Sequence, residues 1–168
     1  MDSTRRHIIL RSAEWHAVAA IRSSSPLKDR GAIKQCVALI KTEELGEIES
    51  MTGIRQQEAY DLWHAKTVEG IVAKAPELSF GWAAKLVNVY IKTLAYISDD
   101  FWPKLRGAIH PAIDGMLQDM LEKEGLQKTK VGLKDMDREA YRRLIAEYRN
   151  VAAAQNIALV EVDKYWEY

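Results

Sequence analysis

Three polar side chains lie in the most apolar part of the chain. Lys85, Asn88 and Lys92 are spaced 0, 3 and 7 within residues 80–97, so in a helix they form one polar stripe on an apolar rod. A buried ammonium must find a partner, lose its proton or face a cleft. A lysine in a cleft is the amine nucleophile of Schiff-base chemistry. The alternative is that the stripe is the solvent-exposed edge of the helix, with lysine stems covering apolar neighbours.

A second group with chemical potential is the segment His110-Pro111-Ala112-Ile113-Asp114. Proline suits the first turn of a helix, so we expect a helix that opens at His110-Pro111, with Asp114 in its first turn. Asp114 could act there as a general base or position a water molecule, and His110 could carry a proton or act as a ligand. The alternative is that Asp114 only stabilises the helix through its dipole.

Metal and phosphate motifs are incomplete. Asp61 and His64 are spaced i, i+3, but a di-iron bundle needs Glu-x-x-His motifs on two helices, and only this one imperfect version is present. The chain has neither G-x-x-x-x-G-K nor G-x-G-x-x-G. We therefore predict no metal and no cofactor.

Two of the five tryptophans, Trp82 and Trp102, flank the apolar segment. Large rings bury much area, so a place in the core or at its edge is one interpretation. The other is that Trp82 and Trp102 form the wall of a pocket or stack on a planar ligand, which makes them, with Asn88 and Lys92, candidate substrate-binding residues.

These residues must be positioned by helices, because hydrophobic side chains recur at helical spacing along almost the whole chain. We predict a single all-α domain over residues 1–168, with six to eight helices around the central apolar helix 80–97. Only two short segments could be extended, His7–Leu10 and Ala158–Val162. The predicted helices are Ser12–Ile21, 28–42, 43–51, 54–73, 80–97, one from His110-Pro111 to Gly125, 137–154, and a last short one within 157–168 that carries Tyr165 and Trp166.

The charge of the chain is balanced only on average. The 168 residues hold 24 Lys+Arg and 24 Asp+Glu, which argues against a polybasic polyanion binder, and the 48% hydrophobic content excludes a disordered chain. Residues 1–42 nevertheless hold eight basic and three acidic side chains, and residues 128–150 hold seven and four. Either these segments form a phosphate-binding face, or they are solvated helix faces attracted to acidic neighbours. The candidate nucleic-acid contacts are Lys128, Lys130, Arg138, Arg142 and Arg149.

The segment Pro76-Glu77-Leu78-Ser79-Phe80-Gly81-Trp82-Ala83-Ala84-Lys85-Leu86, followed by Pro111-Ala112-Ile113-Asp114, resembles the helix-hairpin-helix DNA glycosylases. The resemblance covers about residues 76–121. It implies an all-α enzyme that binds DNA at a glycine-containing hairpin and flips a base into a cleft. It assigns Gly81 to the hairpin contact, Lys85 to the amine nucleophile and Asp114 to the catalytic carboxylate.

Three functions are compatible with these patterns. The first is a helical nucleic-acid-associated protein, in particular a base-excision enzyme with Lys85, Asp114 and His110 as catalytic residues. The second is a non-catalytic helical module or homodimer in which helix 80–97 or the aromatic tail contacts a partner. The third is a small-molecule enzyme or sensor with an aromatic-lined pocket. A single cysteine, Cys36, and no uninterrupted apolar run of membrane length favour a cytoplasmic protein without membrane partners.

Overall fold

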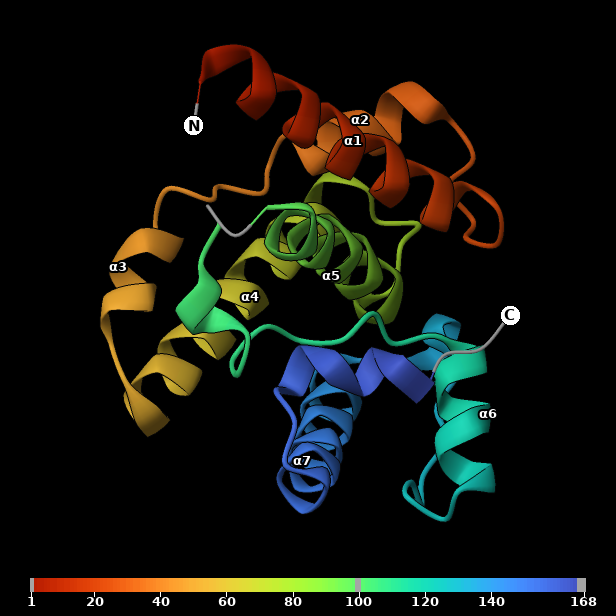
Figure 1. Cartoon of the computed structure of the whole chain (residues 1–168). Helices are drawn as coiled ribbons and strands as arrows, with labels where there is room; N and C mark the ends of the chain where they lie inside the picture. The colour runs from red at the N-terminus through yellow and green to blue at the C-terminus, as the bar shows by residue number, and fades with distance from the viewer. Residues whose placement is uncertain (1, 99–100, 166–168) are drawn as a thin grey trace.

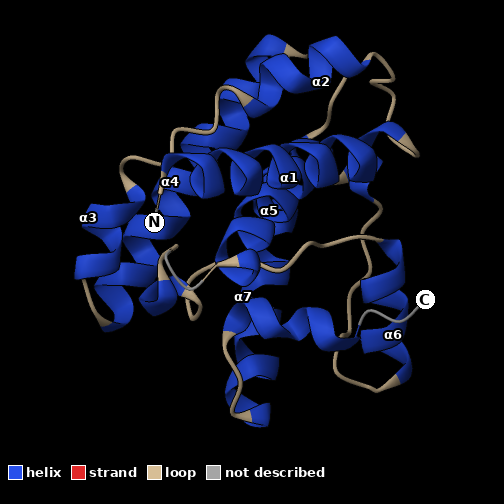
Figure 2. Ribbon diagram, turned by 45° about the horizontal axis from the view of Figure 1, so that its top comes forward, coloured by secondary structure: helices blue, strands red, loops and turns tan. Residues whose placement is uncertain are grey.

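The computed structural model describes residues 2–98 and 101–165, and within these ranges it contains helices and no strands. The predicted all-α class is confirmed, and the helices pack as one compact body (Figure 1 and Figure 2). The α-helices are α1 Ser3–Arg22, α2 Arg30–Val37, α3 Leu45–Ser50, α4 Gly53–Lys74, α5 Phe80–Ile97, α6 Gly115–Lys123 and α7 Arg138–Gln155. The 3-10 helices are η1 Pro103–Leu105, η2 Leu133–Asp135 and η3 Leu159–Tyr165.

Helix α5 is central, as its composition predicts. It begins at Phe80 and ends at Ile97, the predicted bounds, and the Ser79 side chain caps it by accepting from the Trp82 N–H at 3.3 Å. It packs against α1, α2, α4 and α7, and most of its side chains are buried. Figure 1 shows it enclosed, with α1 and α2 on one side and α7 on the other. Its exposed apolar side chains are Tyr96 and Ile97, so α5 offers a partner little apolar surface.

Aspartate side chains cap four of the seven α-helices in the described part of the chain. Asp2, Asp29, Asp114 and Asp137 each accept a hydrogen bond from the backbone N–H three residues on. Such a cap satisfies one of the amides that the first turn leaves without an intrahelical partner. The prediction of Asp137 as the cap of α7 is confirmed.

The helix predicted over Ser12–Ile21 is longer, since α1 spans Ser3–Arg22, and the two short segments that could be extended are helical instead. His7–Leu10 is not extended but lies within α1, because Asp2 caps that helix and its apolar face packs on α5. Ala158–Val162 is not extended either, since Leu159–Tyr165 forms η3. The helix predicted between Lys28 and Thr42 is shorter, as α2 spans Arg30–Val37. The predicted helix end at Asp99-Asp100 and the predicted place of Trp166 lie outside the described residues.

The largest correction concerns residues 110–114. They do not open a helix: they form a segment without regular secondary structure, and α6 begins only at Gly115 with Asp114 as its N-cap. The cause is long-range hydrogen bonding. The carbonyl of Pro111 accepts from the Asn88 side chain at 2.8 Å, and the N–H of Ala112 donates to the Asp163 carboxylate at 3.0 Å. These bonds take backbone groups that a helix would use for itself.

Gly81 joins the first turn of α5 to η2. It is buried, and its N–H donates to the carbonyl of Met136 at 3.1 Å. A Cβ on Gly81 would lie 2.6 Å from the backbone oxygen of Leu133 and 2.8 Å from the Cβ of Met136. Gly81 is therefore a packing residue that permits close approach of two backbones. The interpretation of Gly81 as a nucleic-acid contact is not retained, because its backbone faces the protein.

Replacing Gly81 by alanine should lower the free energy of unfolding by about 1–3 kcal/mol, because the backbone of Leu133 must move. Gly70 is the matched control, since it lies within α4 with open space around it. Gly70→Ala should raise the free energy of unfolding by up to about 1 kcal/mol through helix propensity. Urea unfolding followed by tryptophan fluorescence measures both values. Equal effects of the two substitutions would contradict the close approach at Gly81.

Candidate functional site

The polar stripe of α5, formed by Lys85, Asn88 and Lys92, anchors the segment 110–114. Asn88 is fully buried and holds the Pro111 carbonyl, while the Lys85 ammonium lies 3.1 Å from the Asp114 carboxylate. The stripe is therefore not a solvent-exposed edge. It connects the core helix to this segment, and a cavity lies on each side of the segment.

The first cavity has a volume of about 400 Å³ and lies between α1, α5 and the C-terminal segment. It contains both lysines of the stripe and the predicted carboxylate. Its lining residues are His16, Ala20, Ser23, Lys85, Val89, Lys92, Thr93, Ala112, Asp114 and Asp163. The resemblance to the helix-hairpin-helix DNA glycosylases implies that Lys85 and Asp114 act together, and the fold brings them to one cavity.

Asp114 is held rigidly toward Lys85. Its Oδ1 accepts from the N–H of Leu117 at 3.0 Å as the cap of α6, and its Oδ2 accepts from Lys85 Nζ at 3.1 Å. The two side chains are only 13% and 16% exposed. A carboxylate fixed at a helix N-terminus beside a partly buried amine can accept a proton from that amine.

A second ion pair lines the same cavity. Lys92 Nζ donates to Asp163 Oδ2 at 2.6 Å, and Asp163 also accepts from the backbone N–H of Ala112. Burial raises the pKa of Asp163 despite the Lys92 ammonium and the Ala112 N–H, and the nearby Asp114 carboxylate raises this pKa further. Sequence reasoning did not find Asp163, because it stands alone in the tail without a motif. Its carboxylate lines the same cavity as the Lys85–Asp114 pair.

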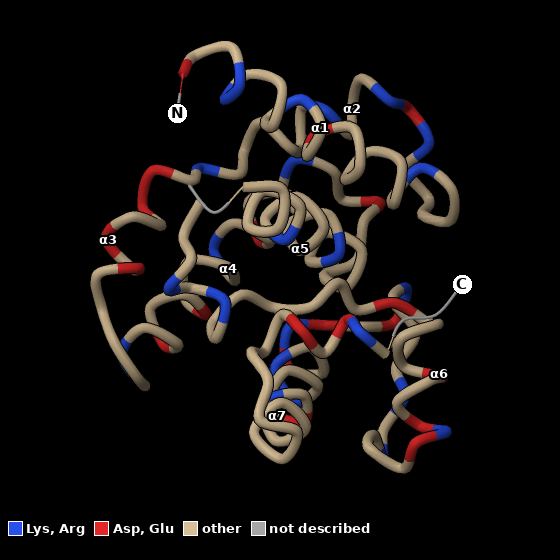
Figure 3. Tube along the Cα trace, viewed as in Figure 1, with Lys and Arg blue, Asp and Glu red and all other residues tan. Residues whose placement is uncertain are grey.

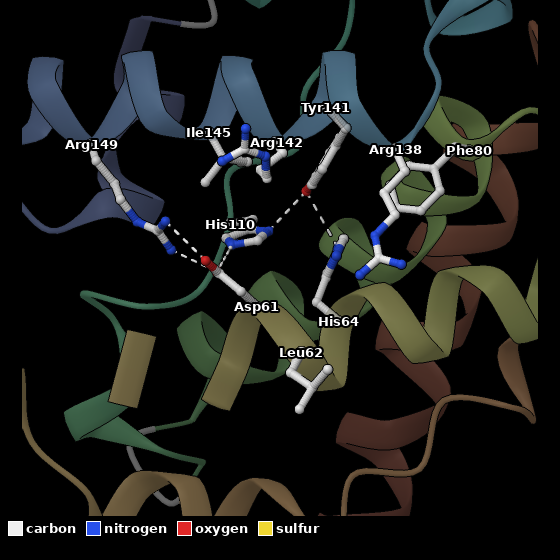
Figure 4. Close-up of a pocket in the computed structure, with 10 residues that line it drawn as sticks. All are labelled: Asp61, Leu62, His64, Phe80, His110, Arg138, Tyr141, Arg142, Ile145 and Arg149. Carbon is white, nitrogen blue, oxygen red and sulfur yellow. Dashed lines mark hydrogen bonds and ion pairs between the residues drawn. The ribbon is translucent and has the colours of Figure 1, made fainter. Parts of the chain in front are cut away.

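The second cavity has a volume of about 250 Å³ and lies between α4 and α7 (Figure 4). Its floor consists of buried histidine and tyrosine side chains, and arginines from α7 surround its mouth. The lining residues are Asp61, Leu62, His64, Phe80, His110, Arg138, Tyr141, Arg142, Ile145 and Arg149.

The side chains of the floor form a chain of hydrogen bonds, and only one assignment of donors and acceptors is possible along it. Asn88 Nδ2 must face the Pro111 carbonyl, which only accepts, so Asn88 Oδ1 accepts from Nε2–H of His64 at 2.8 Å. Asn88 Nδ2 also donates to the hydroxyl of Tyr141 at 2.9 Å, and that hydroxyl donates to Nδ1 of His110 at 2.9 Å. Both imidazoles are then neutral tautomers protonated at Nε2.

The chain ends at a paired carboxylate. His110 donates through Nε2 to Oδ1 of Asp61 at 2.9 Å, and Arg149 donates to both oxygens of Asp61 at 2.6 and 3.0 Å. Figure 4 shows Arg149 directed at Asp61 and the Tyr141 hydroxyl between the two imidazoles. Burial raises the pKa of Asp61, but hydrogen bonds from His110 and Arg149 outweigh it and lower this pKa to about 2.

Burial keeps the histidine and tyrosine side chains of this hydrogen-bond chain uncharged. It lowers the pKa of His110, and it lowers the pKa of His64 well below its ordinary value, with His110 adding to the effect. Burial raises the pKa of Tyr141 well above its ordinary value. At neutral pH the only charges in this hydrogen-bond chain are therefore the Asp61 carboxylate and the Arg149 guanidinium, which neutralise each other.

Acid should destabilise the fold through the two buried histidines. In the unfolded chain both bind protons near pH 6.5, whereas the folded state, with lowered pKa values, resists protonation. Their contribution is fully present above about pH 6.5 and is lost as the pH falls toward the folded pKa. We expect the free energy of unfolding to fall as the pH drops below about 6.5, because the unfolded chain then binds more protons than the folded state. Asp163 acts in the opposite sense, because its pKa is raised.

Denaturant unfolding at several pH values measures this dependence. His110→Gln should flatten the slope between pH 6.5 and 5, because it removes one buried titrating group. His7→Gln is the control, since His7 is exposed on α1. A slope that is unchanged in His110→Gln would contradict the assignment.

The remaining predicted site residues do not all lie at one cavity. Trp82 is partly exposed and its ring lies 5.7 Å from Lys85 Nζ, so it stands beside the first cavity. Trp102 is buried outside the lining of both cavities. His110 and Asn88 belong to the hydrogen-bond chain, and His110 is separated from Lys85 and Asp114, which line the other cavity.

The predicted arginine face of α7 exists, but every arginine on it has an acidic partner. Arg138 pairs with Glu69, Arg142 pairs with Glu139, and Arg149 pairs with Asp61. Two of these pairs link α7 to α4, so oppositely charged segments do attract (Figure 3). Lys128 and Lys130 are exposed away from both cavities, and Lys130 pairs with Asp119.

Sequence reasoning found Asp61 and His64 only as an incomplete metal motif and missed the role of Tyr141. Among the described residues, no group of His, Cys, Asp or Glu side chains could hold a metal ion. No helix in this part of the chain is both long and apolar enough to cross a bilayer. Comparison with protein-family models, with curated proteins and with solved structures finds no match.

Proposed function

We propose that this protein is a nucleic-acid enzyme of the base-excision type, with Lys85 as the amine nucleophile and Asp114 as the carboxylate that moves its proton. The single observation that supports this best is the 3.1 Å contact between Lys85 Nζ and Asp114 Oδ2 inside a 400 Å³ cavity. An amine and a carboxylate in contact, shielded from bulk water but open to a cavity, are the groups that glycosidic-bond cleavage with Schiff-base formation requires.

The proposed reaction joins Lys85 Nζ to C1′ of a nucleotide and releases the base. Lys85 Nζ transfers a proton to Asp114 and attacks C1′ of the nucleotide, and the electron pair of the breaking C1′–N bond leaves with the base. The base takes the proton from Asp114. A proton then moves from Nζ to the sugar ring oxygen, the ring opens, and a Schiff base links Lys85 to C1′. Asp114 is a carboxylate again at the end of the sequence.

The surroundings of the cavity supply groups for a nucleic acid. Ser23 lines the cavity at the end of α1, and Lys28 lies beside it, donating to the carbonyls of Arg22 and Ser23. Arg22 and Lys28 are exposed, so their charges can contact phosphates. Trp82 next to Lys85 offers an aromatic face on which a base can stack. These contacts favour a nucleic acid over a small amine-reactive metabolite.

Borohydride trapping tests the proposal. The wild-type protein is incubated with duplex oligonucleotides that carry one abasic site, one uracil or one oxidised guanine, and borohydride reduces any Schiff base to a stable adduct. We expect an adduct of protein and DNA with at least one substrate, located on Lys85 by peptide mass spectrometry. Adducts on exposed lysines alone, or no adduct and no DNA binding at low salt, would overturn the proposal.

A further inference from the structure

We propose that the second cavity, between α4 and α7, is a binding site for a phosphate monoester. It lies on the other side of the 110–114 segment from Lys85 and Asp114, and neither of these residues lines it. The site is therefore independent of the base-excision chemistry proposed above. Three parts of the cavity, its floor, its mouth and its walls, fit such a ligand.

The floor offers a hydrogen-bond acceptor to a ligand. His64 is 1% exposed and lines the cavity, and the hydrogen-bond chain described above makes its Nε2 a donor to Asn88. Its Nδ1 therefore carries a lone pair. A ligand whose body carries an N–H or O–H group can donate to this nitrogen.

The floor does not repel an anion. The negative charge of Asp61 is neutralised by two hydrogen bonds from Arg149, and His64, His110 and Tyr141 are neutral. Both terminal nitrogens of Arg149 are thereby engaged, while its buried Nε has no hydrogen-bond partner among the described residues, and its role is to position Asp61. The cations left for a ligand are Arg138 and Arg142 at the mouth.

These two arginines can exchange their partners. The Arg138 side chain is 61% exposed and that of Arg142 is 72% exposed, and their partners Glu69 and Glu139 are exposed as well. Exposed ion pairs contribute little to stability, so an incoming anion displaces these carboxylates at low cost. A ligand carboxylate would only replace one carboxylate by another. A phosphate dianion carries more charge and three oxygens, so it can engage both guanidinium forks at once.

The walls select an organic phosphate over the free ion. Phe80, Ile145 and Leu62 line the cavity with apolar surface, which inorganic phosphate alone would leave uncovered. The volume of about 250 Å³ equals roughly eight water molecules at about 30 Å³ each. This space accommodates a base or sugar, with the phosphate at the open mouth. Such a group occurs on a free nucleotide and on the 5′ end of a nucleic-acid strand.

Isothermal titration calorimetry distinguishes these two sources. The arms are adenosine 5′-monophosphate, adenosine, inorganic phosphate, and a short single-stranded oligonucleotide with or without a 5′-phosphate. We expect binding of the monophosphate or of the 5′-phosphorylated strand, at least tenfold tighter than binding of its unphosphorylated counterpart. Tighter binding of the mononucleotide identifies a free nucleotide as the ligand, and tighter binding of the strand identifies a nucleic-acid end.

Variants locate the site. Arg142→Gln should weaken binding by at least tenfold, because a bidentate charge-assisted contact is lost. Arg143→Gln is the matched control, since Arg143 is 64% exposed on the same helix, lies near the same Glu139 and does not line the cavity. Equal losses in Arg142→Gln and Arg143→Gln, or no phosphate-dependent binding, would overturn the inference.

Discussion

Lys85→Gln should abolish covalent capture of DNA, with a loss of about 10³-fold or more in the rate of adduct formation. An amide nitrogen cannot form a Schiff base, because its lone pair is delocalised into the carbonyl. Glutamine nevertheless retains a polar terminus that can donate to Asp114 Oδ2, so the local structure and the cap of α6 should persist. The measurement is the initial rate of borohydride-trapped adduct with the substrate that the wild-type protein accepts.

Asp114→Asn and Lys123→Gln complete this experiment. Asparagine is a good N-cap, so it preserves the hydrogen bond to the Leu117 N–H, but it cannot take the proton of Lys85. We expect Asp114→Asn to slow the reaction by about 10²–10⁴-fold while leaving the protein folded. Lys123 is exposed near the end of α6, and Lys123→Gln should react at the wild-type rate. A trapped adduct that persists at full rate in Lys85→Gln would exclude Lys85 as the nucleophile.

Asn88→Leu should lower the free energy of unfolding by about 3–5 kcal/mol, which is a large part of the stability of an ordinary domain. The substitution keeps a side chain of similar size but removes one acceptor and one donor group. It leaves the buried His64 Nε2–H without its Asn88 acceptor, and it removes the side-chain donor to the Pro111 carbonyl, which keeps only the Ile113 N–H at 2.9 Å. The Tyr141 hydroxyl loses its donor as well. Each buried polar group left unpaired costs about 1–3 kcal/mol.

Thr93→Val is the matched control on the same helix. The Thr93 hydroxyl donates only to the Val89 carbonyl within α5, and Thr93 is partly exposed. We expect a loss of less than about 1 kcal/mol for this variant, because that carbonyl can still bond to water or to the helix. Guanidinium unfolding, followed by tryptophan fluorescence at pH 7, measures both. A loss below 1 kcal/mol for Asn88→Leu would show that the hydrogen-bond chain is not essential to the core.

Local sequence signals predict much of the helical framework. The stripe of apolar residues in α4 and the apolar composition of α5 place these helices within a residue or two of their structural bounds. Ser79 and Asp137 mark the starts of α5 and α7, because a side-chain oxygen at a helix start satisfies a backbone N–H that is already nearby in sequence. Such interactions span three residues, so composition and spacing alone reveal them.

The candidate site is only partly visible in the sequence. The spacing of Lys85, Asn88 and Lys92 predicts one polar stripe, and the fold confirms that all three point to polar partners. The partners themselves come from far along the chain: Asp163 lies 71 residues from Lys92, and Tyr141 lies 53 residues from Asn88. No local pattern marks such residues before the helices pack.

The conformation of residues 110–114 shows most directly what tertiary structure decides. Proline after histidine favours a helix start, and the sequence by itself determines that a helix follows, with Asp114 near its beginning. Where that helix begins depends on Asn88 and Asp163, which take the Pro111 carbonyl and the Ala112 N–H into bonds across the core. Helical periodicity thus determined the elements of this protein. Packing alone decided which side of residues 110–114 each charged or titratable side chain occupies. The hydrogen bonds that hold this segment in place form only between distant parts of the chain.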